Sequence, residues 1–191
     1  ERINVHGAAD RQIFTYMDSE LRGKQDFAGT NSTLVDTLKL EWQETSDSEV
    51  RDKIDFIRGD DTFEGGKYRD RKGWYLGDII YSAPIVVGPP RSFHLENDYQ
   101  SFKNQYLTRA TMIYVGANDG MLHAFSASDG SEAWGFIPEK ILSNLIHLTL
   151  ESCHRYYVDL SATVGDVWDQ AWRTAGKDWT GWRTVLLGGN R

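Results

Sequence analysis

Residues 112–138, MIYVGANDGMLHAFSASDGSEAWGFIP, decide the fold class that we expect for this chain. Three short apolar runs are separated by Asn118-Asp119-Gly120 and by Asp129-Gly130. Asn and Gly tolerate positive φ angles, and Asp-Gly pairs favour the primed turns that match the twist of paired strands. The stretch therefore predicts three antiparallel β-strands joined by tight turns.

The apolar pattern of these strands indicates a sheet that is covered on both faces. The first run, Met112–Val115, is apolar at every position, and the second keeps Met121, Leu122, Ala124 and Phe125. A sheet with one wet face would alternate apolar and polar residues instead. Small antiparallel sheets covered on both faces are typical of a β-propeller, in which each four-stranded blade packs between its neighbours. We therefore expect a mainly β fold, a partial and modified propeller with antiparallel blades and inserted helices.

An internal repeat, which a propeller should contain, extends this prediction. The pair Ser82-Ala83 recurs as Ser161-Ala162, and the string at 112–118 resembles that at 184–190. The repeat predicts one full blade with a polar insertion at 89–109. Its four strands are expected near 78–87, 111–117, 121–127 and 131–137.

The same repeat predicts the first half of a second blade. This blade begins near Arg155 with Tyr156-Tyr157-Val158, reaches its second strand at 183–187, and carries a loop at 169–182 that is rich in Trp and charge. Two strands are then missing, and open blade faces and edges would be left bare. We therefore expect the chain to be a segment of a larger propeller, with 74–191 forming one full blade and the first half of the next.

Residues 1–73 are expected to supply a strand of a preceding blade, a polar loop and a helix of the same propeller. Residues 12–16 resemble the fourth strand of a blade, and 18–45 are polar and turn-rich. A helix is predicted from Ser46, which has the spacing of a capping box with Glu49, to a left-handed cap at Gly59. A further helix, from Pro138 to about Leu150, is expected to connect the two blades.

Composition excludes several classes of partner. Lys and Arg number 21 against 28 Asp and Glu, a net charge of −7. An acidic chain without a basic block is a poor match for nucleic acid or for an anionic membrane surface. No run approaches the length of a transmembrane segment. The single cysteine, Cys153, cannot form an internal disulfide, and we expect a structural role for it.

The sequence offers no catalytic, cofactor-binding or metal-binding residues that we can name. The five histidines show no ligand spacing; they are His6, His94, His123, His147 and His154. No acidic loop matches a calcium-binding hand, and no glycine-rich turn matches a dinucleotide site. Asp119 and Asp129 each precede a glycine, and turn geometry explains both.

Two short motifs carry alternative interpretations. Arg58-Gly59-Asp60 is the tripeptide that integrins recognise on exposed loops, but Gly59 also suits a helix cap and Arg58 a helix C-terminus. Trp134, four residues after Gly130, resembles the tryptophan that docks one blade on the next in quinoprotein propellers. We expect Trp134 to be a structural residue of the blade motif, together with Asn118-Asp119-Gly120 and Asp129-Gly130.

Several strings together resemble the PilC/PilY family of type IV pilus-associated proteins. Leu76–Pro84 is similar to the strand that opens the family's propeller, and Val115–Phe125 is similar to its most characteristic string. His154–Asp159, Val164–Val167 and Trp182–Gly189 look like the next blade. The resemblance is firm over 74–191 and looser over 1–73.

This resemblance implies a propeller region near the C-terminal end of a large exported protein at the cell surface, associated with the outer membrane or the pilus tip. Such proteins help pili assemble, oppose their retraction, and support adhesion and twitching motility. The implied partners are major or minor pilins, the rest of the propeller, and a host or abiotic surface. Some members bind calcium, so calcium is possible in the full-length protein, although no cofactor is expected in this segment.

Two other functions remain open at this point. The same blades could form a quinoprotein-type dehydrogenase, although a single cysteine argues against the vicinal disulfide that is common there. They could also form a generic outer-membrane scaffold. We favour a non-enzymatic assembly and adhesion module, in which rigid blades present the loops 18–45, 89–109 and 169–182 for contact.

Overall fold

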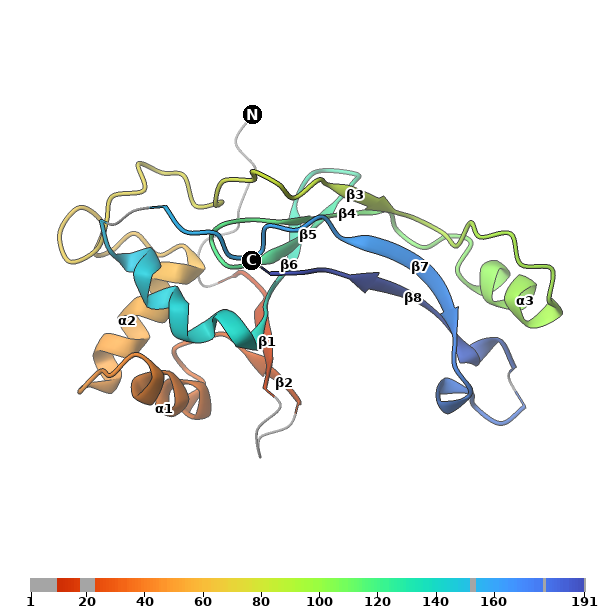
Figure 1. The fold of residues 1–191 in the computed structure, drawn as a ribbon, viewed down its shortest axis with the longest axis horizontal. Coiled ribbons are helices and arrows are strands. Elements are labelled where there is room, and N and C mark those ends of the chain that lie inside the picture. The colour runs from red at the N-terminus through yellow and green to blue at the C-terminus, as the bar shows by residue number, and fades with distance from the viewer. Residues whose placement is uncertain (1–9, 18–22, 152–153, 177, 191) are drawn as a thin grey trace.

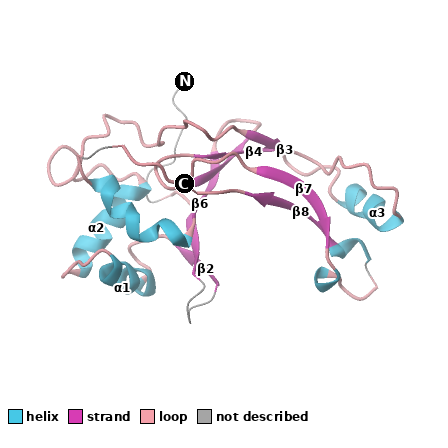
Figure 2. Cartoon of the chain, viewed as in Figure 1, coloured by secondary structure: helices cyan, strands magenta, loops and turns pink. Residues whose placement is uncertain are grey.

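The structure of the chain, a computed structural model, describes residues 10–17, 23–151, 154–176 and 178–190. The molecule is elongated (Figure 1), with a helical lobe at one end, a small lobe around helix α3 (Asn97–Gln105) at the other, and β-strands between them. Strands make up the middle of the molecule, as Figure 2 shows. His6 and Cys153, for which the sequence suggested roles, lie outside the described residues.

The central element is a six-stranded sheet with the order β2-β1-β6-β5-β4-β3. Its strands are β1 (Ile13–Met17), β2 (Gly23–Asp26), β3 (Ile85–Val87), β4 (Met112–Gly116), β5 (Leu122–Ser126) and β6 (Glu132–Ile137). Strands β3 to β6 follow one another in antiparallel pairs, which confirms the predicted antiparallel meander. The first strand of the blade is shorter than expected, because only 85–87 of the segment 78–87 pair in the sheet.

Strand β1 differs from its predicted place. We expected residues 12–16 in a preceding blade, but β1 pairs in parallel with β6 of this sheet, with Ile13 opposite Gly135. Strand β2 then pairs antiparallel to β1 at the edge. Burial explains the placement, because Ile13, Thr15 and Met17 are all buried on one face, and this face packs on the helical lobe. The sheet is open rather than closed on itself.

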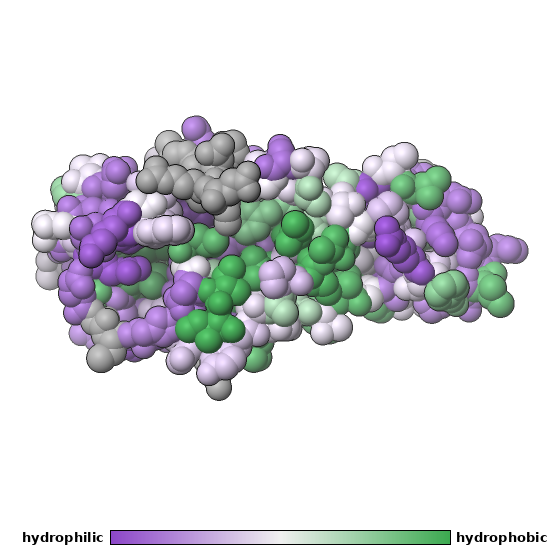
Figure 3. All heavy atoms as spheres, turned by 90° about the horizontal axis from the view of Figure 1, so that it is seen from above, coloured by the Kyte–Doolittle hydropathy of each residue, from purple (hydrophilic) through white to green (hydrophobic). Residues whose placement is uncertain are grey.

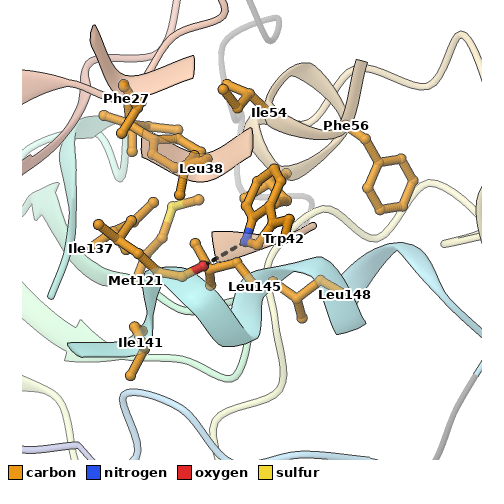
Figure 4. Packing of buried hydrophobic residues seen from close by; sticks show 14 of the residues in the cluster. Phe27, Leu38, Trp42, Ile54, Phe56, Met121, Ile137, Ile141, Leu145 and Leu148 are labelled. Atoms are coloured by element: carbon orange, nitrogen blue, oxygen red, sulfur yellow. Dashed lines mark hydrogen bonds between the residues drawn. The ribbon is translucent and has the colours of Figure 1, made fainter. Parts of the chain in front are cut away.

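The helical lobe consists of α1 (Ser32–Glu41), α2 (Asp47–Arg58) and the 3-10 helix η1 (Glu139–Thr149). Its buried apolar side chains form one core with those of β1 and β6 (Figure 4). The indole Nε1 of Trp42 donates a 2.9 Å hydrogen bond to the carbonyl of Leu142, so the end of α1 is fixed to η1. The lobe therefore holds β1 against the blade.

Two predictions for this lobe have different outcomes. The helix that ends at Gly59 is confirmed: Ser46 is its N-cap and Gly59 is left-handed, with φ of 113°. Ser46 caps the backbone N–H of Ser48 at 3.2 Å, however, and not that of Glu49. The prediction that 18–45 is a loop was wrong, because α1 lies within it and buries Leu34, Val35 and Leu38.

A second, two-stranded sheet pairs β7 (Thr163–Trp168) with β8 (Trp182–Leu187) in antiparallel fashion. Strand β8 lies where the repeat predicted it. The first strand is β7 rather than Tyr156-Tyr157-Val158, which lies outside any strand although Tyr157 and Val158 are buried. None of the described helices is long and apolar enough to cross a membrane.

The two predicted loops, 89–109 and 169–182, form the small lobe. The first contains α3, and the second contains the short 3-10 helices η2 (Gln170–Trp172) and η3 (Asp178–Gly181). An aromatic core joins them, made of Tyr99, Phe102 and Trp182 with Trp179 packed against it. The expected polar insertion is therefore a folded unit.

Candidate functional site

The turn Asn118-Asp119-Gly120 lies at the junction of the two sheets. The backbone N–H of Asn118 donates to the carbonyl of Asp78 at 3.0 Å, and the Asn118 side-chain oxygen accepts from the backbone N–H of Tyr157 at 3.0 Å. Asp78 precedes the first sheet's β3, and Tyr157 precedes the second sheet's β7. One turn between β4 and β5 thus binds the segments that lead into both sheets.

The carboxylate of Asp119 binds backbone N–H groups at the same junction. Its Oδ2 accepts from the backbone N–H of Gly77 at 2.8 Å, and its Oδ1 accepts from that of Met121 at 3.1 Å. The backbones approach so closely that a Cβ on Gly77 would lie 2.2 Å from the backbone nitrogen of Asp119. Only glycine fits at residue 77 without displacing the turn.

The two leading segments also bind each other directly. Ser161 Oγ accepts from the backbone N–H of Ala83 at 2.9 Å, and an Asp159 oxygen accepts from that of Tyr81 at 3.1 Å. Within the first sheet, Ser82 Oγ accepts from the N–H of Gly116 at 2.9 Å. The repeated Ser-Ala pairs therefore lie side by side where the two sheets meet.

A buried charged network continues from Asp119 into the first sheet. His123, 1% exposed, lies between two carboxylates: its Nε2 is 3.1 Å from Asp119 Oδ1 and its Nδ1 is 2.7 Å from Glu132 Oε1. The imidazole ring stacks on Phe125 with centroids 5.5 Å apart. Both ring nitrogens are engaged, so His123 ties β5 to β6 and to the turn.

Arg11 extends this network to the helical lobe. Its Nε and Nη2 donate to the Glu132 carboxylate at 2.6 and 2.8 Å, and its Nη1 donates to the carbonyl of Arg58 at 2.7 Å. Arg58 in turn donates to the carbonyls of Arg11 and Phe27, at 2.8 and 2.7 Å. Charged groups buried this deeply are tolerated because Arg11 is paired with Glu132 and the Arg58 guanidinium is hydrogen-bonded to backbone carbonyls.

The network sets the charge states of its members. Burial alone would lower the pKa of His123, but the Asp119 and Glu132 carboxylates outweigh it and raise that pKa to about 9. Burial alone would raise the pKa of Glu132, yet hydrogen bonds from His123 and Arg11 lower it to about 2. The pKa of Asp119 is also lowered, because His123 outweighs the effect of burial. At neutral pH Asp119, His123 and Glu132 are therefore negative, positive and negative in turn.

Arg58-Gly59-Asp60 lies at the C-terminus of α2. Arg58 is 7% exposed, with its guanidinium directed into the molecule. Gly59 is the left-handed cap, and Asp60 Oδ1 accepts from the backbone N–H of Thr62 at 2.7 Å. This geometry suits helix capping and core hydrogen bonding better than presentation to a receptor.

The other motif residues lie on the blade. Gly120 and Gly130 both have positive φ, 91° and 74°, and Asp129 Oδ1 accepts from the N–H of Ser131 at 3.0 Å in an exposed turn. The half-buried Trp134 packs on Phe14 and Tyr114, with centroids 5.5 and 5.6 Å apart. It also lines a pocket of about 350 Å³ whose other wall is Val164 and Leu186 of the second sheet. Trp134 and residues of the second sheet therefore line the same pocket.

Sequence reasoning missed Arg11, His123 and Glu132. A signal existed for two of them, since His123 and Glu132 are ionisable residues within strands that were predicted to be covered on both faces. Arg11 lies 121 residues from Glu132, so no local pattern could connect them. Within the described residues, no three His, Cys, Asp or Glu side chains are grouped so as to hold a metal ion.

The antiparallel strands β3 to β6 and the second antiparallel sheet define a mainly β protein. A family model described as the PilY1 beta-propeller domain matches residues 76–189, more than half of the chain. The chain belongs to this PilY1 family. No solved structure matches it.

Curated relatives agree with the family match. The type IV pilus biogenesis factor PilY1 homolog of Xylella fastidiosa is 37% identical over 169 residues, covering 82% of this chain and 13% of the relative. PilY1 of Pseudomonas aeruginosa strain UCBPP-PA14 is 39% identical over 141 residues, covering 68% of this chain and 12% of the relative. PilY1 of strain PAK is 34% identical over 159 residues, covering 78% and 13%. The chain thus spans only 12 to 13% of the length of these relatives.

Proposed function

We propose that this chain is a propeller segment of a type IV pilus biogenesis factor and acts there without catalysis, as an assembly and adhesion module. The observation that carries the proposal is the match of residues 76–189 to the PilY1 beta-propeller domain. That range contains the blade strands β3 to β6, the junction turn and the second sheet. The names of the curated relatives, type IV pilus biogenesis factors, support the part in pilus biogenesis.

The proposal includes the domain organisation. Residues 74–191 form one full quinoprotein-like blade and the first half of the next, and 1–73 belong to the same propeller. The second sheet supports this, because its Val164, Thr184 and Leu186 face the first sheet across the pocket beside Trp134. Exposed Ile79, Ile80 and Val86 on the leading segment and β3 also support it. Figure 3 shows apolar side chains gathered over the middle of the molecule, as expected for a surface that further chain covers.

In this proposal the small lobe contacts pilins or a target surface. His94 is held between Tyr99 and Trp182, with ring centroids 4.8 and 4.7 Å away. Its neighbours Phe93 and Leu95 are 102% and 92% exposed. His94 therefore anchors the chain between two exposed apolar side chains at the end of the molecule, and exposed apolar groups of this kind mark surfaces that bind partners.

The cellular role follows from this contact. An exported protein at the cell surface or pilus tip that holds pilins through a rigid lobe would favour extension over retraction. It would thereby support surface attachment and twitching motility. The small lobe is the feature of this chain that would serve these roles.

The proposal is tested in a strain that lacks the gene, complemented with the full-length protein. The double variant Phe93→Ser/Leu95→Ser should restore several-fold fewer surface pili than the wild type at equal protein level. Leu40→Ser, which changes an 81% exposed residue on α1 at the opposite end, is the matched control and should restore normal piliation. Full piliation by the lobe variant would contradict the lobe contact, and unchanged piliation in the deletion strain would contradict the function itself.

A further inference from the structure

A pocket of about 490 Å³ lies beside the junction turn. It is lined by residues of the segment 69–78, by residues of 147–151 and 154–157, and by Asn118. None of the motif reasoning from the sequence pointed to this pocket, because its walls come from segments about 80 residues apart. Its chemistry differs from that of the acidic chain as a whole, whose net charge is −7.

Three cationic side chains line the pocket without an ion pair among the described residues: Arg69, Lys72 and Arg155. Arg69 is held in place, because its Nε donates to the carbonyl of Leu148 at 2.6 Å. Among the described residues, no hydrogen bond or ion pair engages its two terminal nitrogens. Arg71 also lines the pocket, but it is buried and paired with Glu64. A guanidinium fixed through Nε is well placed to bind a carboxylate with its remaining N–H groups.

Among the described residues, none of the acidic side chains that line the pocket forms an ion pair with Arg69, Lys72 or Arg155. Asp70 Oδ1 accepts from the backbone N–H of Lys72 at 2.7 Å. Asp78 Oδ2 accepts from the Asn118 side chain at 3.2 Å and lies 2.8 Å from His154 Nε2. Two of the three lining carboxylates are therefore engaged within the chain, and the third belongs to the exposed Glu151.

Tyr157 lines the pocket together with Arg69 and Arg155. Tyr157 is 3% exposed and its hydroxyl donates to the carbonyl of Asn144 at 3.1 Å. Burial raises the pKa of Tyr157, while Arg155 and Arg69 both act to lower it. Arg69 and Arg155 are thus two cations of one pocket, and both act on the same buried side chain.

The rim supplies apolar surface next to these cations. Trp74 is 75% exposed and Leu150 is 49% exposed, and both line the pocket. An indole face and a leucine beside two guanidinium groups suit a ligand that carries a carboxylate and an apolar group a few ångströms apart. A peptide with acidic and apolar side chains has this character, whereas a free inorganic anion uses only the cations.

We propose that this pocket binds an acidic peptide segment of a protein partner, with its carboxylates on Arg69 and Arg155 and an apolar neighbour on Trp74. The inference does not depend on the pilus function, because it concerns binding by the purified protein. It also uses a different surface from the small lobe.

The test measures fluorescence anisotropy of two labelled nonapeptides with the purified full-length protein. One repeats Glu-Asp-Leu and the other repeats Gln-Asn-Leu. The acidic peptide should bind and the neutral one should bind at least ten-fold more weakly. The double variant Arg69→Ala/Arg155→Ala should bind the acidic peptide at least ten-fold more weakly than the wild type. Arg91→Ala/Arg183→Ala removes the same charge from exposed residues outside the pocket, and this control should leave binding within two-fold of the wild type.

Three outcomes would overturn the proposal. In the first, the two peptides bind equally well. In the second, the pocket variant and the control variant lose equal affinity for the acidic peptide. In the third, inorganic phosphate displaces the acidic peptide completely and binds as tightly as the peptide does. Arg69 also donates a hydrogen bond to the carbonyl of Leu148, so its loss could disturb the fold. The single variant Arg155→Glu is therefore tested beside the double variant. Arg155 is exposed and makes no described hydrogen bond, so its reversal should abolish peptide binding without a change in thermal unfolding. Unchanged peptide binding by this variant would equally contradict the proposal.

Discussion

The side-chain oxygen of Asn118 accepts a 3.0 Å hydrogen bond from the backbone N–H of Tyr157 and so joins the turn of one sheet to the segment that leads into the next. Both residues are buried, at 5% and 3% exposure. A side chain that satisfies a distant buried N–H couples the two sheets without a shared strand.

Asn118→Ala should therefore weaken the coupling between the sheets. It leaves the Tyr157 N–H buried without this acceptor, which costs about 1–3 kcal/mol of unfolding free energy. Denaturant unfolding followed by tryptophan fluorescence measures the change. Asn104→Ala, at an exposed residue of α3, is the control and should change stability by less than about 0.5 kcal/mol. Equal stability of the two variants would show that the contact does not couple the sheets.

Gly77→Ala tests the close approach of the leading segment to the turn. The added Cβ would meet the Asp119 backbone nitrogen at 2.2 Å, and backbone cannot move aside as a flexible side chain can. We expect a loss of about 1–3 kcal/mol or more. Gly165→Ala on β7 is the matched control, since nothing lies within 4 Å of a Cβ there. A Gly77→Ala protein as stable as the control would contradict the packing at the junction.

His123 should make stability depend on pH in the neutral to alkaline range. Its folded pKa of about 9 lies above the ordinary value of 6.5, so its stabilisation is complete below about pH 6.5 and is lost as the pH rises through 9. The full effect is on the order of 3 kcal/mol. Chemical unfolding at pH 6 to 9.5 should show a declining free energy in the wild type and a flatter profile in His123→Gln.

Glu132 makes stability depend on pH in the acidic range, and in the opposite direction to His123. Its pKa of about 2 lies below the ordinary 4.5, so its stabilisation is present above pH 4.5 and is lost as the pH falls through 2.

For the His123 experiment, His154→Gln, which changes an exposed histidine, serves as the control and should keep the alkaline decline of the wild type. If His123→Gln declined as steeply as the wild type, the charged network would not be the cause.

Substitutions within residues 58–60 distinguish a structural role of this tripeptide from an adhesive one. Arg58→Ala removes two hydrogen bonds to buried carbonyls and should lower the unfolding free energy by about 2–3 kcal/mol. Asp60→Ala should change it by less than about 1 kcal/mol, since the hydrogen bonds described for its carboxylate are local ones with Thr62, two residues away. Piliation and host-cell attachment should be normal in Asp60→Ala. A large loss of attachment in this folded variant would assign the tripeptide an adhesive role.

Local patterns predicted the elements that depend on local physics. The turns at 118–120 and 129–130 fixed the meander, and Ser46 and Gly59 fixed the ends of α2, because caps and turns act within a few residues. Helix α1 had a comparable signal in the Asn31 cap and the spacing of Leu34, Val35 and Leu38, but the polar residues around it obscured the pattern. The parallel pairing of β1 with β6 and the bond from Arg11 to Glu132 join residues about 120 apart, and only tertiary packing determines them.

The central claim is that the two sheets are neighbouring blades of one larger propeller. Within the described residues, β8 pairs only with β7, so a completed blade would place a further strand on its free edge. Hydrogen–deuterium exchange of the full-length protein measures this directly at Trp182–Leu187. We predict that the β8 amides that point away from β7 exchange as slowly as the amides of β4. Exchange of those amides as fast as in an unpaired edge strand, while β4 stays protected, would contradict the propeller.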